Sequence, residues 1–382
     1  MPMLRRTFIA SMATMPLMSR GAAADVEAEL ERIRTKHKLP ALGGAFVTLD
    51  GAQLTVVSGT RKAGTQVAAT KDDLWHLGSD TKAMTSTLAG VAVEAGKLRW
   101  DSTLGDVFPK AKGLKESSLA SATLTQLLTH WSGLPAKSLW KVTPFNARAL
   151  IKERADVLEA AADLKGLPEP GSVHLYSNLG YVLAGHMLEE VYNQSWEELM
   201  KALIFKPLGM TLSGFGGTGT PGKVDQPWPH MADGTPTPQN GPSIDNPPAI
   251  GPAGTVHASL ADWARFIAEH LAGPAGKGKL LKAETYRHLH TPVLGSDYAF
   301  GWKALDQSWG GKVIAHNGSN TMWYSEMAVV PDWDLAIVVT CNDANARSRT
   351  QVGEVLGALA QRFGKPQEAS RPVSGDPAPG AK

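Results

Sequence analysis

Strand-like segments occur near both ends of this chain, and helical segments fill most of the region between them. Residues 41–60 alternate apolar and small side chains around Asp50-Gly51, a dipeptide that favours a tight hairpin turn. Further apolar segments follow toward the C-terminus, at 298–304, 312–316, 322–330 and 335–341. The spacing of these segments predicts an antiparallel meander, with a turn at 331–334. Strands from both ends of the chain are therefore expected to share one sheet.

Helical periodicity dominates the rest of the sequence. Apolar residues recur at helical spacing in the segments 25–38, 157–164, 179–199, 259–271 and 352–363. Residues 215–254 are rich in Gly, Pro and Asp and predict long loops. The predicted fold class is α/β (α+β), with a sheet lobe of residues 25–78 and 251–365, flanked by helices, and an inserted, mostly helical lobe of residues 79–250. A cleft between the lobes is the default position for a functional site.

Residues 1–24 are typical of an export signal. Arg5 and Arg6 precede a modest apolar run at 8–18, and the alanines at 22–24 supply the small residues of a cleavage site. The paired arginines resemble a twin-arginine signal, with an ordinary Sec signal as the alternative. We therefore expect an exported, periplasmic protein. No membrane span is expected after signal removal, because no other stretch approaches the roughly 18 apolar residues of a span.

The composition excludes several classes of protein. The chain of 382 residues is 43% hydrophobic and 19% charged, which suits a globular core, and its net charge of +2 offers no footprint for a nucleic-acid partner. Cys341 is the only cysteine, so no intramolecular disulfide can form, and its apolar surroundings indicate a core residue. The Pro-, Ser- and Ala-rich residues 366–382 predict a disordered tail.

No cofactor or metal is expected. The glycine-rich stretch 214–222 lacks the Gly-Lys-Ser/Thr ending of a phosphate-binding loop. His288 and His290 have no neighbouring cluster of carboxylates or cysteines, so they are interpreted as solvated loop histidines. The sequence contains no Gly-x-Ser-x-Gly, which argues against an α/β-hydrolase.

A serine and a lysine three residues apart offer a nucleophile with its own base. Residues 79–82 read Ser-Asp-Thr-Lys at the start of a helical pattern that extends to Ala95. Because residues i and i+3 share a helix face, Lys82 can reach the Ser79 hydroxyl and take its proton. The alternative is a serine helix cap beside a lysine that extends its amine to solvent. A second Ser-x-x-Lys, at 138–141, shows that the tetrapeptide alone is weak evidence.

Further segments give this pair a context. They are Tyr176-Ser177-Asn178, His316-Asn317-Gly318-Ser319 and the stretch 127–135, Leu-Leu-Thr-His-Trp-Ser-Gly-Leu-Pro. Together with Ser-x-x-Lys they resemble the motif set of the serine β-lactamase and penicillin-binding protein superfamily. The most similar branch carries Ser-x-x-Lys, Tyr-x-Asn and Lys/His-x-Gly in this order, and includes class C β-lactamases, D,D-carboxypeptidases and family VIII-type esterases. The resemblance extends over residues 27–363.

The resemblance implies a catalytic role for the residues of the first two motifs. Ser79 would attack a carbonyl carbon and form an acyl-enzyme. Either Lys82 or Tyr176 would be the base that activates it, and the sequence leaves that choice open. Asn178 would orient Lys82 or the substrate. His130, in the stretch 127–135, would support the structure without a catalytic role.

The strand motif would complete the site, and it also departs from the family pattern. The backbone N–H groups of Ser79 and Ser319 would hold the oxyanion, and Gly318 would let the strand approach the substrate closely. His316 stands where typical class A and C β-lactamases carry a lysine, a cation that helps to grip a substrate carboxylate. Because histidine is mostly neutral at pH 7, this substitution favours an esterase or peptidase over a β-lactamase.

These observations favour an exported serine hydrolase that cleaves an ester or amide in a small molecule or short peptide. An esterase or D-peptidase-like enzyme ranks first, and a β-lactamase is the alternative. A penicillin-binding or sensing protein that acylates with negligible turnover is a further alternative. A non-catalytic scaffold would require the set of Ser79, Lys82, Tyr176 and Ser319 to be accidental. No pattern in the sequence indicates the substrate or the oligomeric state.

Overall fold

The structure is a computed structural model. It describes residues 20–363, with gaps at 50, 52, 136–149, 232, 239–243, 294, 308–310 and 345–347. Residues 1–19 of the predicted export signal lie outside the described residues. The same holds for the predicted tail and for the second Ser-x-x-Lys match.

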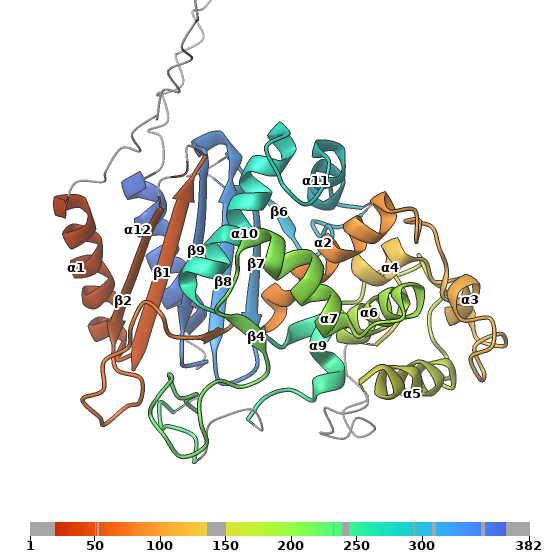
Figure 1. The fold of residues 1–382 in the computed structure, drawn as a ribbon, viewed down its shortest axis with the longest axis horizontal. Helices are drawn as coiled ribbons and strands as arrows, with labels where there is room; N and C mark the ends of the chain where they lie inside the picture. The colour runs from red at the N-terminus through yellow and green to blue at the C-terminus, as the bar shows by residue number, and fades with distance from the viewer. Residues whose placement is uncertain are drawn as a thin grey trace, which may run out of the picture.

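A six-stranded antiparallel sheet joins the two ends of the chain (Figure 1). Its strand order is β2-β1-β9-β8-β7-β6. The strands are β1 (Ala41–Thr48), β2 (Gln53–Gly59), β6 (Lys303–Gln307), β7 (Gly311–Ser319), β8 (Tyr324–Val330) and β9 (Leu335–Cys341). Strand β1 lies between β2 and β9, with Ala45 opposite Val338, so the N-terminal hairpin pairs with the C-terminal meander. This arrangement confirms the predicted fold class.

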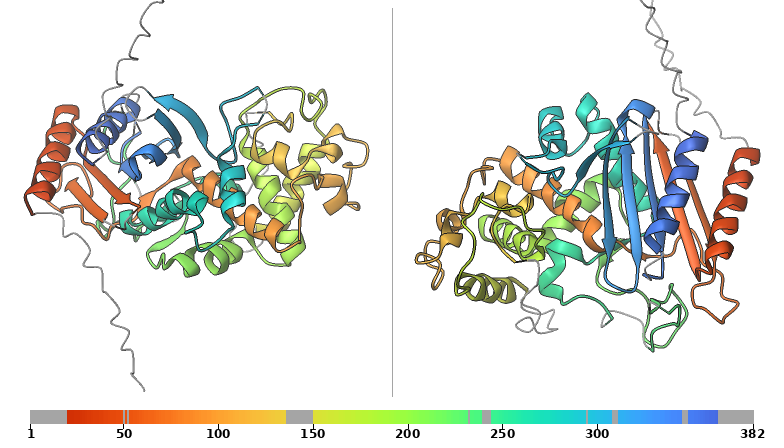
Figure 2. Two further views of the ribbon diagram at one scale, coloured as in Figure 1. Left: turned by 90° about the horizontal axis from the view of Figure 1, so that it is seen from above. Right: turned by 180° about the vertical axis from the view of Figure 1, so that it is seen from behind.

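Helices cover both faces of the sheet. Helices α1 (Arg20–His37) and α12 (Ser348–Phe363) lie side by side on one face, and α10 (Leu260–Ala272) covers the other (Figures 1 and 2). Strand β9 is buried throughout, and its side chains alternate between the two hydrophobic cores. Ile337 and Cys341 join the core under α1 and α12, whereas Val338 joins the core under α10. The prediction that Cys341 is a core residue is confirmed.

Most elements between β2 and β6 are helices, and apart from α10 most of them lie beside the sheet (Figure 1). Its first helix, α2 (Thr81–Glu94), is buried along most of its length and ends before Gly96, which has a φ of 68°. A small sheet of order β3-β5-β4 lies beside the start of α2. The remaining elements are β3 (Trp75–His76), α3 (Leu104–Val107), α4 (Leu124–Leu128), α5 (Leu150–Ala162), α6 (Asn178–Tyr192), α7 (Trp196–Met200), α8 (Lys206–Leu208), β4 (Ser213–Phe215), α9 (Gly251–Gly254), β5 (Val256–Ala258) and α11 (Ala283–His290).

Two predicted segments differ from the structure. The helix predicted over 179–199 ends at Tyr192, because Asn193 adopts the left-handed conformation, and α7 then begins with a capping box between Ser195 and Glu198. The strand predicted at 298–304 is shifted, since β6 begins only at Lys303. A Cβ atom added to Gly301 would lie 2.6 Å from the Ala83 amide nitrogen, so this segment packs against the start of α2 before it joins the sheet.

The interpretation of His288 and His290 as solvated loop histidines was wrong. Both belong to helix α11, and the His290 imidazole lies 2.9 Å from that of His270 on α10. Burial lowers the pKa of His290 to about 3. Within the described ranges, no group of three or more His, Cys, Asp or Glu side chains is arranged to hold a metal ion. None of the helices in that part of the chain is long and apolar enough to cross a membrane.

A buried ion-pair network connects the helices around the site. Arg154 of α5 is fully buried and pairs with Glu189 of α6 and with Glu197 of α7. Its Nε also donates to the Ala249 carbonyl at 3.0 Å, just before α9 begins. A buried guanidinium is stable only when its donors are satisfied, and here three separate segments supply the acceptors.

Candidate active site

Ser79 lies in a single 3₁₀ turn, Gly78–Asp80, between β3 and α2. The end of β7 packs directly against this turn. A Cβ atom on Gly78 would lie 2.3 Å from the Ser319 amide nitrogen, and one on Gly318 would lie 1.9 Å from the Leu77 carbonyl oxygen. Gly78 also has a φ of 50°, which favours glycine. Both glycines are therefore needed where the serine turn meets the strand.

The Lys82 amine is buried among three oxygen atoms. Lys82 has no exposed surface, and its Nζ lies 2.7 Å from the Ala253 carbonyl, 2.8 Å from Asn178 Oδ1 and 2.9 Å from Ser79 Oγ. The carbonyl and the amide oxygen can only accept hydrogen bonds. In the neutral amine they take the two N–H groups, which leaves the lone pair directed at the Ser79 hydroxyl.

Burial also favours that neutral form. Desolvation lowers the pKa of Lys82 to about 7, although the nearby Asp80 opposes the shift. A large fraction of the amine is then unprotonated at neutral pH. Lys82 thus combines the position and the protonation state of a general base.

Tyr176 faces the same serine from the other side of the site. Its ring centroid lies 5.0 Å from Lys82 Nζ, and 39% of the residue is exposed. The atoms packed around its hydroxyl desolvate it and raise the pKa of Tyr176 above its ordinary value, although a hydrogen bond with Ser79 opposes the shift. The phenol is therefore protonated at neutral pH and can donate a hydrogen bond.

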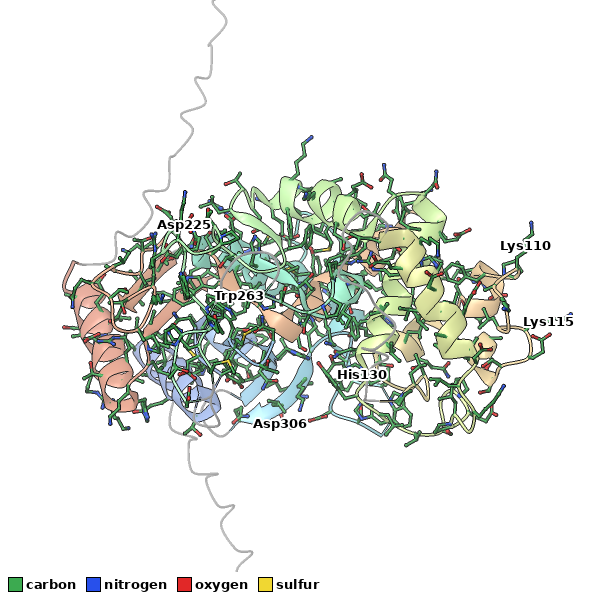
Figure 3. The ribbon with its side chains drawn as sticks, turned by 90° about the horizontal axis from the view of Figure 1, so that it is seen from below. Lys110, Lys115, His130, Asp225, Trp263 and Asp306 are labelled. Carbon is green, nitrogen blue, oxygen red and sulfur yellow. The ribbon has the colours of Figure 1, made fainter. Side chains whose placement is uncertain are left out.

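His130 holds the segment that carries Tyr176. Its carbonyl accepts from the Leu175 amide at 2.8 Å, and its Nδ1 accepts from the Ser177 amide at 3.1 Å. The imidazole also packs on the Tyr176 ring, with 4.3 Å between centroids. Figure 3 places His130 between the strands and the neighbouring helices. These contacts fit the supporting role expected for His130.

His316 is buried and neutral. Its Nδ1 donates to the Asn317 carbonyl at 2.8 Å, so its Nε2 accepts from the Tyr298 hydroxyl at 3.0 Å. Burial, helped by the positive charge of Lys82, lowers the pKa of His316 to about 3. At physiological pH this position therefore offers no cation to a substrate.

Two residues beside the site were not anticipated. The Tyr298 hydroxyl donates to His316 Nε2, and no sequence motif marks that tyrosine. Asp80 is fully buried, with one carboxyl oxygen 2.8 Å from the Ser325 hydroxyl and the other 3.3 Å from His316 Nδ1. Desolvation raises the pKa of Asp80 well above its ordinary value. An acidic residue within an otherwise buried helix start was a signal that could have been used.

The structure brings the predicted site residues together. Ser79, Lys82 and Asn178 are linked by hydrogen bonds through the lysine amine, and the Tyr176 ring lies beside that amine. Gly318 and Ser319 lie against the serine turn. His316, two residues before Gly318 and on the same face of β7, lies beside Tyr298 and Asp80. The arrangement supplies a hydroxyl nucleophile, a buried amine and a phenol donor around one point.

Comparisons with known proteins agree with this arrangement. A model of the Beta-lactamase family matches residues 26–361. Penicillin-binding protein 4 of Amycolatopsis lactamdurans is 28% identical over 372 residues, which are 92% of this chain and 94% of that protein. A β-lactamase of Providencia stuartii is 28% identical over 209 residues, 54% of this chain and 50% of that protein. An unguisins hydrolase of Aspergillus campestris is 22% identical over 292 residues, 72% of this chain and 53% of that protein.

The chain thus spans about half the length of the latter two relatives. Among solved structures, a class C β-lactamase from Rhodobacter sphaeroides superposes with a TM-score of 0.70 and 22% identity, over 89% of this chain and 99% of that one. This likeness shows a shared fold. Since the family model matches most of its length, the chain belongs to the β-lactamase family, within the serine β-lactamase and penicillin-binding protein superfamily.

Proposed function

We propose that the protein is a serine hydrolase that cleaves an ester or amide through an acyl-enzyme on Ser79. The observation that carries the proposal is the position of Lys82 Nζ, 2.9 Å from Ser79 Oγ, with carbonyl-type oxygens occupying its other hydrogen-bond directions. Of the three groups around the Lys82 amine, only the Ser79 hydroxyl can donate a proton to it. A helix-capping serine beside a solvated lysine would not require a buried amine.

Proton transfer follows from the same contacts. Neutral Lys82 takes the Ser79 proton as the oxygen attacks the substrate carbonyl, and becomes an ammonium. Tyr176, with its phenol protonated, passes a proton to the leaving group and receives one from the lysine. The backbone N–H groups of Ser79 and Ser319 hold the oxyanion, and each such donor is worth roughly 3–4 kcal/mol of barrier. Water then repeats the sequence on the acyl-enzyme. The pKa directions favour Lys82 over Tyr176 as the acylation base.

The neutral His316 supports the ranking of substrates. A substrate that is held through a carboxylate near His316 would find no positive charge on that side chain. We therefore place an ester or D-amino-acid amide above a β-lactam. A second candidate, a penicillin-binding protein that acylates with negligible turnover, is favoured by the match to penicillin-binding protein 4 over nearly the full length of both chains.

Kinetics with a small panel separates these candidates. Purified protein would be assayed with p-nitrophenyl butyrate, a D-Ala-D-Ala peptide and nitrocefin, and intact mass would be recorded after each incubation. Multiple turnovers of the ester or peptide support the hydrolase. A single burst with a stable mass adduct supports the second candidate. No turnover and no adduct with any of the three would contradict both.

Acylation should depend on pH through Lys82. Its pKa of about 7 lies below the ordinary lysine value, and only the neutral amine can accept the serine proton. We therefore expect kcat/KM for p-nitrophenyl butyrate to rise with pH and to level off above a midpoint of about 7. Lys82→Arg, which stays charged, should be nearly inactive from pH 5.5 to 8.5. A flat profile for the unchanged protein would rule out this assignment of the base.

His316→Lys should shift substrate preference toward carboxylate-bearing substrates. A lysine would add the cation that the neutral imidazole lacks, and a hydrogen bond to a charged group is worth roughly 1.5–3 kcal/mol. We expect the ratio of kcat/KM for nitrocefin over p-nitrophenyl butyrate to rise on the order of tenfold. His316→Gln, which keeps the position neutral, is the matched control and should leave the ratio unchanged. An equal ratio in both variants would show that this position does not set the preference.

We also propose that the protein is exported and that it is divided into two lobes. The export signal at 1–24 and the division into a sheet lobe and a helical lobe rest on the sequence patterns. N-terminal sequencing of the mature protein after cell fractionation tests the first. An N-terminus at Asp25 in a periplasmic fraction is the expected result.

A further inference from the structure

A buried carboxylate joins the two backbone segments that carry the proposed oxyanion donors. The first arm begins at the serine turn, where the Gly78 amide donates to His76 Nδ1 at 3.1 Å. Because Nδ1 accepts, the proton of the neutral imidazole is on Nε2, and that nitrogen donates to the Asp245 carboxylate at 2.9 Å. His76 and Asp245 side chains are each 1% exposed. The amide fixed by this arm belongs to the residue just before Ser79.

The second arm begins at the end of β7. Asn320, the residue after Ser319, donates from Nδ2 to Asp245 Oδ1 at 3.0 Å. Its Oδ1 accepts from the Met322 amide at 3.2 Å, which fixes the orientation of the side-chain amide. Asn320 is 5% exposed. One carboxylate therefore accepts from both sides of the interface between the serine turn and β7.

A second connection crosses the same interface. Ser325 of β8 donates to the Leu77 carbonyl at 2.9 Å and lies 2.8 Å from Asp80. It holds the turn through a carbonyl and a side chain. The bridge through Asp245, in contrast, reaches an amide of the turn and the residue next to Ser319.

We propose that Asp245 is a positioning residue, which through His76 and Asn320 sets the separation and direction of the Ser79 and Ser319 N–H groups that hold the oxyanion. The inference rests on the proposed acyl transfer at Ser79. Donors of an oxyanion hole act only within a narrow range of distance, and a displacement of about 1 Å can cost roughly a hundredfold in rate. Asp245 lies outside the regular elements, just before the 3₁₀ turn Pro248–Ile250, so an irregular stretch of the chain sets the geometry of the site.

The test uses Asp245→Asn with ester kinetics and a transition-state analogue. An asparagine can accept from one arm, but its NH₂ group faces the donor of the other arm. We expect kcat for p-nitrophenyl butyrate to fall ten- to a hundredfold with KM within about twofold. The Ki for butylboronic acid should rise by the same factor as kcat falls, because its tetrahedral adduct places an oxygen between the two donors. Asn320→Ala should act in the same direction, and the double variant should lose no more than Asp245→Asn alone.

Glu269→Gln is the matched control. Glu269 is another buried carboxylate, 5% exposed, which accepts from the Leu280 amide at 2.8 Å and from the Tyr286 hydroxyl of α11, and it has no hydrogen bond to the serine turn or to β7 among those described. This variant should lower Tm and leave kcat and the boronate Ki unchanged. If Asp245→Asn behaves like this control, with a lower Tm but unchanged kcat and boronate Ki, the bridge has only a structural role and the inference is overturned. An unchanged protein that neither turns over nor becomes acylated would instead overturn the proposed function, and the inference with it.

Discussion

Ser79→Ala is expected to lower kcat for p-nitrophenyl butyrate by on the order of 10⁴- to 10⁶-fold, the loss that follows removal of a nucleophile in serine hydrolases of other folds. The methyl group leaves Lys82 Nζ without the one contact that can give it a proton. No covalent adduct should then form. The measurement is steady-state hydrolysis together with intact mass after incubation with substrate.

Ser138→Ala is the control for this prediction. It removes the serine of the second Ser-x-x-Lys match in the same chain. We expect full activity and the same adduct as in the unchanged protein. Turnover that survives Ser79→Ala, or that disappears with Ser138→Ala instead, would contradict the assignment of the nucleophile.

Arg154→Met is expected to lower the free energy of unfolding by about 3–5 kcal/mol. Arg154 has no exposed surface, and its removal leaves the buried Glu189 carboxylate and the largely buried Glu197 without their countercharge. The substitution also removes the donor to the Ala249 carbonyl, in the turn that leads into α9. Because α9 carries the Ala253 carbonyl that holds Lys82, kcat should fall in the fraction that remains folded. Urea unfolding followed by tryptophan fluorescence gives the first quantity.

Lys152→Met is the control on the same helix. Lys152 pairs with Asp156 one turn later, and the two side chains are 74% and 53% exposed. An exposed ion pair is screened by solvent and contributes little, so the unfolding midpoint should hardly move. If the two variants unfold at similar urea concentrations, the buried network does not stabilise the fold as argued.

Most of the sheet could be predicted because strand alternation is a local property. The hairpin of β1 and β2 and the last strands of the meander have this alternation and a clear turn. One error occurred where a distant contact outweighed the local pattern, and another where a local helix cap was missed. Gly301 packs against the start of α2, which delays β6, and a left-handed Asn193 divides the helix predicted over 179–199.

The site residues also fall into two groups, those that local spacing predicts and those that depend on distant contacts. Ser79 and Lys82 share one face of a helix start, so their proximity follows from their spacing. Asp245 lies in a stretch predicted as loop and Tyr298 in a predicted strand, and neither belongs to a catalytic motif; each acts by a contact with a residue far away in sequence. No sequence pattern places such residues beside the site.

By itself, the sequence determined the proposed nucleophile, its neighbouring amine and the alternation that puts strands from both ends into one sheet. Only the tertiary structure decided how these groups behave. Burial lowers the pKa of Lys82 to about 7 and keeps His316 neutral, and packing of β7 on the serine turn brings Ser319 to Gly78. The physical reason is that spacing along a helix or strand is set by the backbone, whereas desolvation depends on which distant segments cover a group.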